Sequence, residues 1–465
     1  MKLPDNFIQQ GITEQDVLRL NSNTYQPGFM QIHLTFPYSE SFAALTDIHD
    51  QGSFLHEYVH YLQNLTTPWG LYTSMLMYET MVNTFAYIQE TSETIKLPLR
   101  LNFGDKIQQR MSIVSNGNGT NPFENDNYHG SFKIDRTKRI IWHRNYTNIG
   151  NGHYPYIELE VPCIDGSKKI KLGAYIIKES MAAMCQMQLD FSAKHEEYDV
   201  PYNLIKILAE QHFPKIAADD KKLISICYIS LFSLTPAQTL IDQLDFANHN
   251  PKYSGMELLE MFVNESTISI NNNTKLSVVT FFDDIANRFE VTLAKSLRTP
   301  LDYIHEAISR VRLSGGIVPL VSALYAPNFD KDTVQTIIDH VGIPYVYTDF
   351  GEYYYPKSVK GETKDSNDII ALIGMSALYN YIVHPNSLKC CPLRYMCMKS
   401  DFDKDECFDA PWEGHACPMT VMGDMLGIKR GLIIALKQYR LYHSNDTASL
   451  AWLQVSLFTW LAIPV

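Results

Sequence analysis

The sequence predicts an α+β protein, in which an N-terminal region of mixed helices and strands precedes a predominantly helical C-terminal region. Residues 28–36 alternate between apolar and polar side chains, as a half-buried strand does. Residues 53–65 carry apolar side chains at helical spacing and contain no glycine or proline. Beyond about residue 200, helical patterns predominate. These three observations give the fold class.

Two consecutive helices are expected after the first strand. The first covers residues 53–65, and either Asp50 or Ser53 can cap its start. Thr-Thr-Pro, ending at Pro68, supplies the stop signal. A second apolar helix, roughly residues 70–90, follows at once. The short connection predicts an antiparallel pair.

The next part of the chain is expected to contain a loop and a small set of strands. Residues 115–127 are rich in Asn and Gly and predict an exposed loop. A further helix is expected after Gly173. The predicted strands cover residues 130–142, 155–162 and 168–172, with a turn at Asp165-Gly166.

Composition excludes several classes of protein. The chain has 465 residues, 45% hydrophobic and 19% charged, which is ordinary for a folded soluble protein. Its formal net charge of −12 argues against a nucleic-acid partner, since phosphate binding needs surplus Lys and Arg. The N-terminus lacks the apolar core of a signal peptide, so a cytoplasmic setting is expected. The uncharged segment 448–465 is interpreted as a buried terminal helix, with a membrane contact as the alternative.

The stretch GSFLHEYVHYLQNL, residues 52–65, places two histidines four residues apart. On a helix, His56 and His60 share one face, where both imidazoles can reach a single ion. Glu57 is rotated about 100° from His56 and cannot easily join them as a ligand. It can instead accept a proton from a water molecule at the metal. The uncharged flanks fit a helix packed inside a catalytic domain.

This HExxH stretch resembles the zincin metallopeptidases, whose shared signature it is. The resemblance covers the motif and some tens of residues around it. It implies that His56 and His60 are zinc ligands and that Glu57 is the general base. The metzincin form HExxHxxGxxH is absent, because Gln63 and Thr66 stand where its Gly and third His would be. The resemblance is therefore to the gluzincin branch, in which a glutamate supplies the third ligand.

Two glutamates are candidates for this third ligand. Glu79 follows HEYVH after eighteen residues, a spacing similar to that of the aminopeptidase branch, with Asn83 in the place of a supporting Asp. Glu179 lies in a pattern similar to a gluzincin third-ligand helix and shares its helix face with Ala182 and Ala183. Three bonds of about 2 Å demand close approach of the two helices. The small side chains therefore favour Glu179.

Some neighbouring residues are weaker candidates. His49 lies seven residues before His56 and is expected to be a capping or core histidine. Gluzincins often use a Tyr or His to stabilise the oxyanion, a role that fits hydrogen-bond donors near the reacting carbonyl. His195, Tyr198 and Tyr202 follow the Glu179 helix, but surface positions are expected for them.

The resemblance also predicts how the chain is divided into domains. Residues 1–215 are predicted to form a zincin-like metallopeptidase domain, with a loop and β-hairpin insertion at about 100–172. Residues 216–465 are predicted to be mostly helical, with a Cys-rich segment at 390–417. Linkers are expected near residues 250–254 and 355–366.

The cysteines fall into two groups. Cys163, Cys185 and Cys227 are scattered and are expected to be small core residues. The other five cysteines lie close together, between residues 390 and 417. Thiolates this close in sequence are typical of a structural zinc site or an iron–sulfur cluster, although no CxxC pair is present. A redox or disulfide role and unligated thiols remain open alternatives. The second group consists of Cys390, Cys391, Cys397, Cys407 and Cys417.

The expected function is hydrolysis of peptide bonds by a gluzincin-type zinc metallopeptidase, with a peptide or protein as substrate. Two alternatives stay open: a non-catalytic interaction or scaffold protein that keeps a zincin fold, and a zinc hydrolase of a non-peptide amide or ester. The presence of Glu57 favours an enzyme, because a structural zinc site has no use for a base there. No pattern in the sequence specifies the substrate, the cleavage preference or the oligomeric state.

Overall fold

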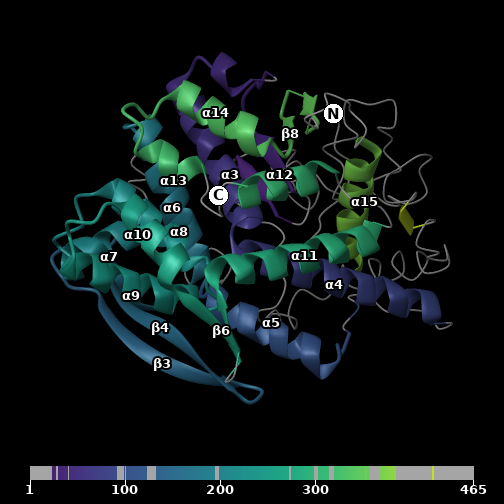
Figure 1. Cartoon of the computed structure of the whole chain (residues 1–465), viewed down its shortest axis with the longest axis horizontal. Coiled ribbons are helices and arrows are strands. Elements are labelled where there is room, and N and C mark those ends of the chain that lie inside the picture. The colour runs from purple at the N-terminus through teal and green to yellow at the C-terminus, as the bar shows by residue number, and fades with distance from the viewer. Residues whose placement is uncertain are drawn as a thin grey trace.

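The computed structural model shows an α+β protein, as the sequence predicts (Figure 1). Its described part contains helices together with sheets of four, three and two strands. It describes residues 23–27, 30–39, 41–91, 99, 101–122, 132–193, 198–271, 274–297, 302–313, 319–350, 352–356, 366–383 and 422–423.

The four-stranded sheet has the order β1-β2-β8-β9. Strands β1 (Thr24–Gln26) and β2 (Gln31–Leu34) form an antiparallel pair. Strand β8 (Tyr345–Thr348) pairs with β2 in parallel, and β9 (Tyr353–Tyr354) pairs with β8 in the antiparallel sense. The sheet thus combines strands from both sides of residue 215, the boundary expected from the sequence.

The helix that carries the HExxH stretch lies at the centre of the molecule (Figure 1). Helix α3 (Ile48–Thr66) contacts β1 and α6 (Ala174–Leu189), and α6 also contacts α8 (Asp220–Ser230). The cap lies earlier than both predicted residues, Asp50 and Ser53, because the Asp47 carboxylate accepts the backbone N–H groups of His49 and Asp50. After a single non-helical residue, α4 (Pro68–Glu90) continues the chain as the second predicted helix.

The segment 100–172 contains a helix that the sequence did not predict. Helix α5 (Asp105–Asn118) runs into the Asn- and Gly-rich stretch that was expected to be a loop. Packing explains the difference: a Cβ at Gly117 would lie 2.4 Å from the Trp69 ring, and Asn116 donates to the carbonyl of Pro155. Tertiary contacts here override the low helix propensity of Asn and Gly.

The strands of the insertion follow α5. They form one antiparallel sheet of β3 (Ile141–Ile149), β4 (Gly152–Cys163) and β5 (Gly166–Leu172). The predicted strand at 130–142 is wrong over most of its length, because Asp135 accepts from the backbone and side chain of Thr137 and forms a turn. The turn before Gly166 matches the prediction.

The remaining described chain is mostly helical. One short helical turn, η1 (Phe42–Ala44), precedes α3, and a two-stranded hairpin of β6 (Thr267–Asn271) and β7 (Thr274–Ser277) precedes α11 (Val278–Leu297). Helix α11 lies along α4 (Figure 1). The helices are α7 (Leu204–His212), α9 (Pro236–His249), α10 (Gly255–Glu265), α11 (Val278–Leu297), α12 (Asp302–Leu313), α13 (Pro319–Leu324), α14 (Lys331–Val341) and α15 (Ser366–Val383).

One hydrophobic core connects the two predicted regions. Its buried side chains extend from Tyr25 to Met422 and include members of most helices. Within the described residues, no helix has the length and apolar character needed to cross a membrane. The apolar segment 448–465 lies outside the described residues.

Candidate metal centre

The first half of the site belongs to α3. Residues 54–66 of this helix are buried without exception, so the helix is enclosed on all sides. His56, Glu57 and His60 are 2%, 1% and 1% exposed. The four-residue spacing places the two imidazoles one turn apart on the same helix face, as the sequence predicts.

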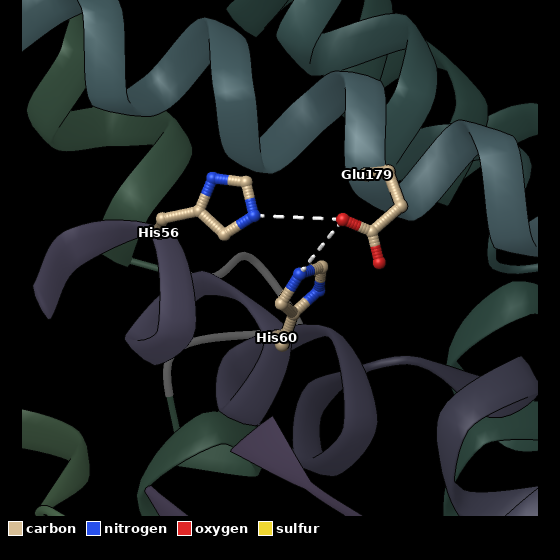
Figure 2. A group of neighbouring side chains, drawn as sticks. All are labelled: His56, His60 and Glu179. Carbon is tan, nitrogen blue, oxygen red and sulfur yellow. Dashed lines mark ion pairs between the residues drawn. The ribbon is translucent and has the colours of Figure 1, made fainter. Parts of the chain in front are cut away.

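The second half of the site belongs to α6. This helix begins at Ala174, after Gly173, which touches the end of α5 so closely that a Cβ would lie 2.2 Å from the backbone of Asn118. Ala182 and Ala183 are fully buried in α6. Glu179 is 0% exposed and its carboxylate points to the two imidazoles of α3 (Figure 2). The contact of α6 with α3 brings the carboxylate to the histidines.

The three side chains meet at spacings that suit a metal ion. Oε2 of Glu179 lies 3.5 Å from Nε2 of His56 and 3.4 Å from Nε2 of His60 (Figure 2). These separations exceed the 2.7–2.9 Å typical of a charge-assisted hydrogen bond. Two ligand atoms of a tetrahedral zinc with bonds of 2.0–2.1 Å are about 3.3–3.4 Å apart. One ligand atom from each residue falls within 4.8 Å of the others.

Several polar atoms of the site lack the hydrogen bonds that buried groups normally make. Nε2 of His60, both carboxylate oxygens of Glu179 and Oε2 of Glu57 have no hydrogen-bond partner within the described part of the chain. Unsatisfied buried polar atoms cost free energy unless a ligand or water satisfies them. A cation between the imidazoles and the carboxylate would satisfy Nε2 of His60 and Oε2 of Glu179.

The electrostatics of the cluster favour a bound cation. Burial raises the pKa of Glu179, but the imidazoles of His60 and His56 outweigh burial and hold that pKa below its usual range. Burial lowers the pKa of His56, but Glu179 and Glu57 outweigh it and raise that pKa above its ordinary value. The raised pKa of His56 indicates negative potential at its ring, where a metal cation in place of the ring proton would be stabilised.

Glu57 is close enough to interact with this cluster. Burial raises the pKa of Glu57, while the charges of His56 and His60 lower it and the charge of Glu179 raises it. Glu57 is not a member of the three-residue group that could hold a metal ion, so it lies beside the cluster and not within it.

The alternative third ligand is elsewhere. Oε1 of Glu79 accepts a hydrogen bond from Nη2 of Arg110 at 2.6 Å, and both side chains are about 30% exposed. The side chain of Asn83 donates to the backbone carbonyl of Glu79. Within the described residues, no hydrogen bond joins it to His56 or His60. Among the described residues, the group that could hold a metal consists of His56, His60 and Glu179.

The other histidine and tyrosine candidates have mixed outcomes. His49 is neither a core residue nor part of the cluster: its side chain is 67% exposed, and Nδ1 lies 2.8 Å from the carboxylate of Asp190. Tyr198 is exposed, as expected. The surface position expected for Tyr202 is wrong, because this side chain is 6% exposed and its ring centroid is 6.0 Å from that of His56. His195 lies outside the described residues.

Tyr202 is a site residue that sequence reasoning placed wrongly. Burial and the negative charges of Glu179 and Glu57 raise the pKa of its phenol, so the phenol stays protonated and can donate a hydrogen bond. The buried Val200 and Leu204 on either side are apolar and offer a signal that this stretch is internal. With 28 tyrosines in the chain, that signal does not single out Tyr202.

The three scattered cysteines are buried free thiols, which confirms them as small core residues. Burial raises the pKa of Cys163, Cys185 and Cys227. The cluster at 390–417 lies outside the described residues, so the second metal site there stays a prediction.

No protein-family model, curated protein or solved structure matches this chain. The interpretation of the site therefore depends on its geometry and chemistry.

Proposed function

We propose that this chain is a zinc-dependent peptidase, with a gluzincin-type site in a zincin-like domain. His56, His60 and Glu179 would hold the zinc ion, and Glu57 would be the general base. The observation that supports this most is the meeting of two buried imidazoles and one buried carboxylate at 3.4–3.5 Å. Two nitrogen ligands and one oxygen ligand, with a fourth position left for water or substrate, are typical of catalytic zinc.

Zinc bound at this position would polarise a substrate carbonyl and make water a stronger acid. The carboxylate of Glu57 then accepts the proton of the attacking water and passes it to the leaving amine. Burial keeps bulk water away and strengthens every charge interaction among these groups.

Tyr202 is the hydrogen-bond donor of the proposed active site. Its protonated phenol lies beside His56, on the stretch between α6 and α7. A neutral donor at this position can hydrogen-bond the oxygen that becomes negatively charged during attack on a carbonyl. We therefore assign Tyr202 the stabilisation of this oxyanion.

The deciding experiment compares wild type, Glu57→Gln and Glu79→Gln for zinc content and for cleavage of a peptide library. Glu57→Gln is expected to keep the zinc content of wild type and to lose cleavage by about 10²–10⁴-fold, the range supplied by a general base. Glu79→Gln makes the same chemical change at a partly exposed ion pair and is expected to match wild type in both measurements.

Other outcomes separate the alternatives. Equal cleavage by Glu57→Gln and wild type contradicts the mechanism. A wild type that binds zinc but cleaves no peptide favours a zinc hydrolase of another amide or ester if it hydrolyses a panel of small esters and amides. If it hydrolyses none of them, a non-catalytic protein that keeps the zinc site is favoured.

A further inference from the structure

Each of the two histidines uses its second ring nitrogen to contact a glutamine. Nδ1 of His60 lies 2.9 Å from Oε1 of Gln63, and Nδ1 of His56 lies 3.1 Å from Oε1 of Gln186. Gln63 is 1% exposed and Gln186 is 7% exposed. Both contacts therefore lie inside the protein, where a hydrogen bond is stronger than in water.

The Gln63 contact determines the tautomer of His60. Nε2 of Gln63 donates to the backbone carbonyl of Lys178 at 3.0 Å, and a carbonyl can only accept. The amide oxygen of Gln63 must therefore face His60, so Nδ1 of His60 carries the proton. Its Nε2 then has a lone pair directed toward Glu179, as a metal ligand requires.

Gln63 also joins the two halves of the site. It lies on α3, three residues after His60, and bonds to Lys178, the residue before Glu179 on α6. One amide group thus fixes the ring of one ligand and the backbone beside another. A shift of α6 relative to α3 would break this bridge.

The amides have a further electrostatic consequence. Bound zinc would carry two positive charges, which the negative charges of Glu57 and Glu179 would balance. Carboxylates in place of the two glutamines would add negative charge beside side chains that are at most 2% exposed, and an uncompensated buried charge is strongly unfavourable. Neutral amides orient the imidazoles without that cost.

We propose that Gln63 and Gln186 are positioning residues of the zinc site, which hold the two imidazoles in the zinc-binding tautomer, and that Gln63 sets the separation of α3 and α6 at the site. This inference depends on the zinc binding included in the proposed function, but not on peptide cleavage. Loss of such an outer hydrogen-bond partner typically weakens metal affinity by about 10–100-fold.

The test measures zinc affinity by competition with a chromogenic chelator, for wild type, Gln63→Met, Gln186→Met and Gln51→Met. Gln51 is the matched control, since it is a buried glutamine of the same helix that donates to the carbonyl of Leu45. Gln63→Met and Gln186→Met are expected to weaken zinc binding by about 10–100-fold. Gln51→Met is expected to stay within about threefold of wild type, since its partner is outside the site.

One further measurement distinguishes positioning from general damage to the fold. The visible spectrum of the Co²⁺-loaded protein reports ligand geometry, and it is expected to change in Gln63→Met but not in Gln51→Met. If Gln63→Met does not fold, Gln186→Met decides the question.

The inference is overturned if folded Gln63→Met and Gln186→Met bind zinc as tightly as wild type and give the same Co²⁺ spectrum. It is also overturned if Gln51→Met weakens binding equally, because the effect would then be one of general stability. A wild type that binds zinc but cleaves nothing contradicts the proposed peptidase and leaves this inference standing. A wild type that binds no zinc contradicts both.

Discussion

Replacing Glu179 with Gln tests the third ligand directly. The substitution keeps the size of the side chain and removes the negative charge that faces His56 and His60. Loss of an outer partner costs about 10–100-fold in metal affinity, so loss of a charged ligand is expected to cost at least about 100-fold. This factor corresponds to about 2.7 kcal/mol of binding free energy.

Thermal unfolding converts this loss into a measurable shift. At a zinc concentration of 100 times the wild-type Kd, zinc stabilises wild type by about 2.7 kcal/mol and a 100-fold weaker variant by about 0.4 kcal/mol. For 465 residues the entropy of unfolding is about 1 kcal/mol per kelvin. The zinc-dependent rise in Tm is therefore expected to be about 3 °C for wild type and below about 1 °C for Glu179→Gln.

Glu79→Gln is the control for this measurement. Its ion pair with Arg110 is about one-third exposed, so its loss costs about 0–1 kcal/mol with or without zinc. The zinc-dependent rise in Tm should match that of wild type. The assignment of the third ligand is wrong if Glu79→Gln abolishes this rise while Glu179→Gln retains it.

Three further predictions concern the surroundings of the site. Tyr202→Phe is expected to lower kcat by about 10²–10³-fold in peptide cleavage and to leave zinc affinity unchanged; an unchanged kcat would rule out an oxyanion role. Gly173→Ala is expected to lower the free energy of urea unfolding by about 1–3 kcal/mol, because the added Cβ would lie 2.2 Å from backbone atoms. The control, Gly104→Ala, has no atom within 4 Å of its added Cβ and should change this free energy by less than about 0.5 kcal/mol. The hydrogen bond to Asp190 raises the pKa of His49 above 6.5, so this pair stabilises the fold below pH 6.5 and loses that contribution as pH rises through the raised pKa. The urea midpoint of wild type, relative to His49→Gln, should therefore fall as pH increases above 6.5, and parallel pH profiles would contradict this.

The local features of the site could be predicted because they depend on neighbours in sequence. The helix around His56 and His60 follows from apolar spacing and the absence of Gly and Pro, and the structure contains it as α3. The turn before Gly166 and the helix after Gly173 are also encoded locally. Where local propensity and packing disagree, as in α5, packing determines the structure and the sequence-based prediction is wrong.

From the sequence, the carboxylate beside the histidines could be narrowed to two glutamates, but the choice between them could not be decided. Glu79 and Glu179 lie 19 and 119 residues beyond His60, and both have plausible patterns. The small residues Ala182 and Ala183 favoured close approach of α6 to α3, and the structure has this contact. Glu79 pairs instead with Arg110, 31 residues further along the chain, and no local pattern in the sequence predicts that contact.

The sequence by itself determined the α+β class, the helix with two histidines on one face, and a glutamate positioned next to the first histidine. These features arise from the 3.6-residue period of the helix, which any short segment can reveal. Only the tertiary structure brought Glu179 to the histidines, placed Tyr202 beside His56 and connected Gln63 to Lys178. These contacts join segments far apart in the chain, and they form because burial of the whole core fixes how the helices pack.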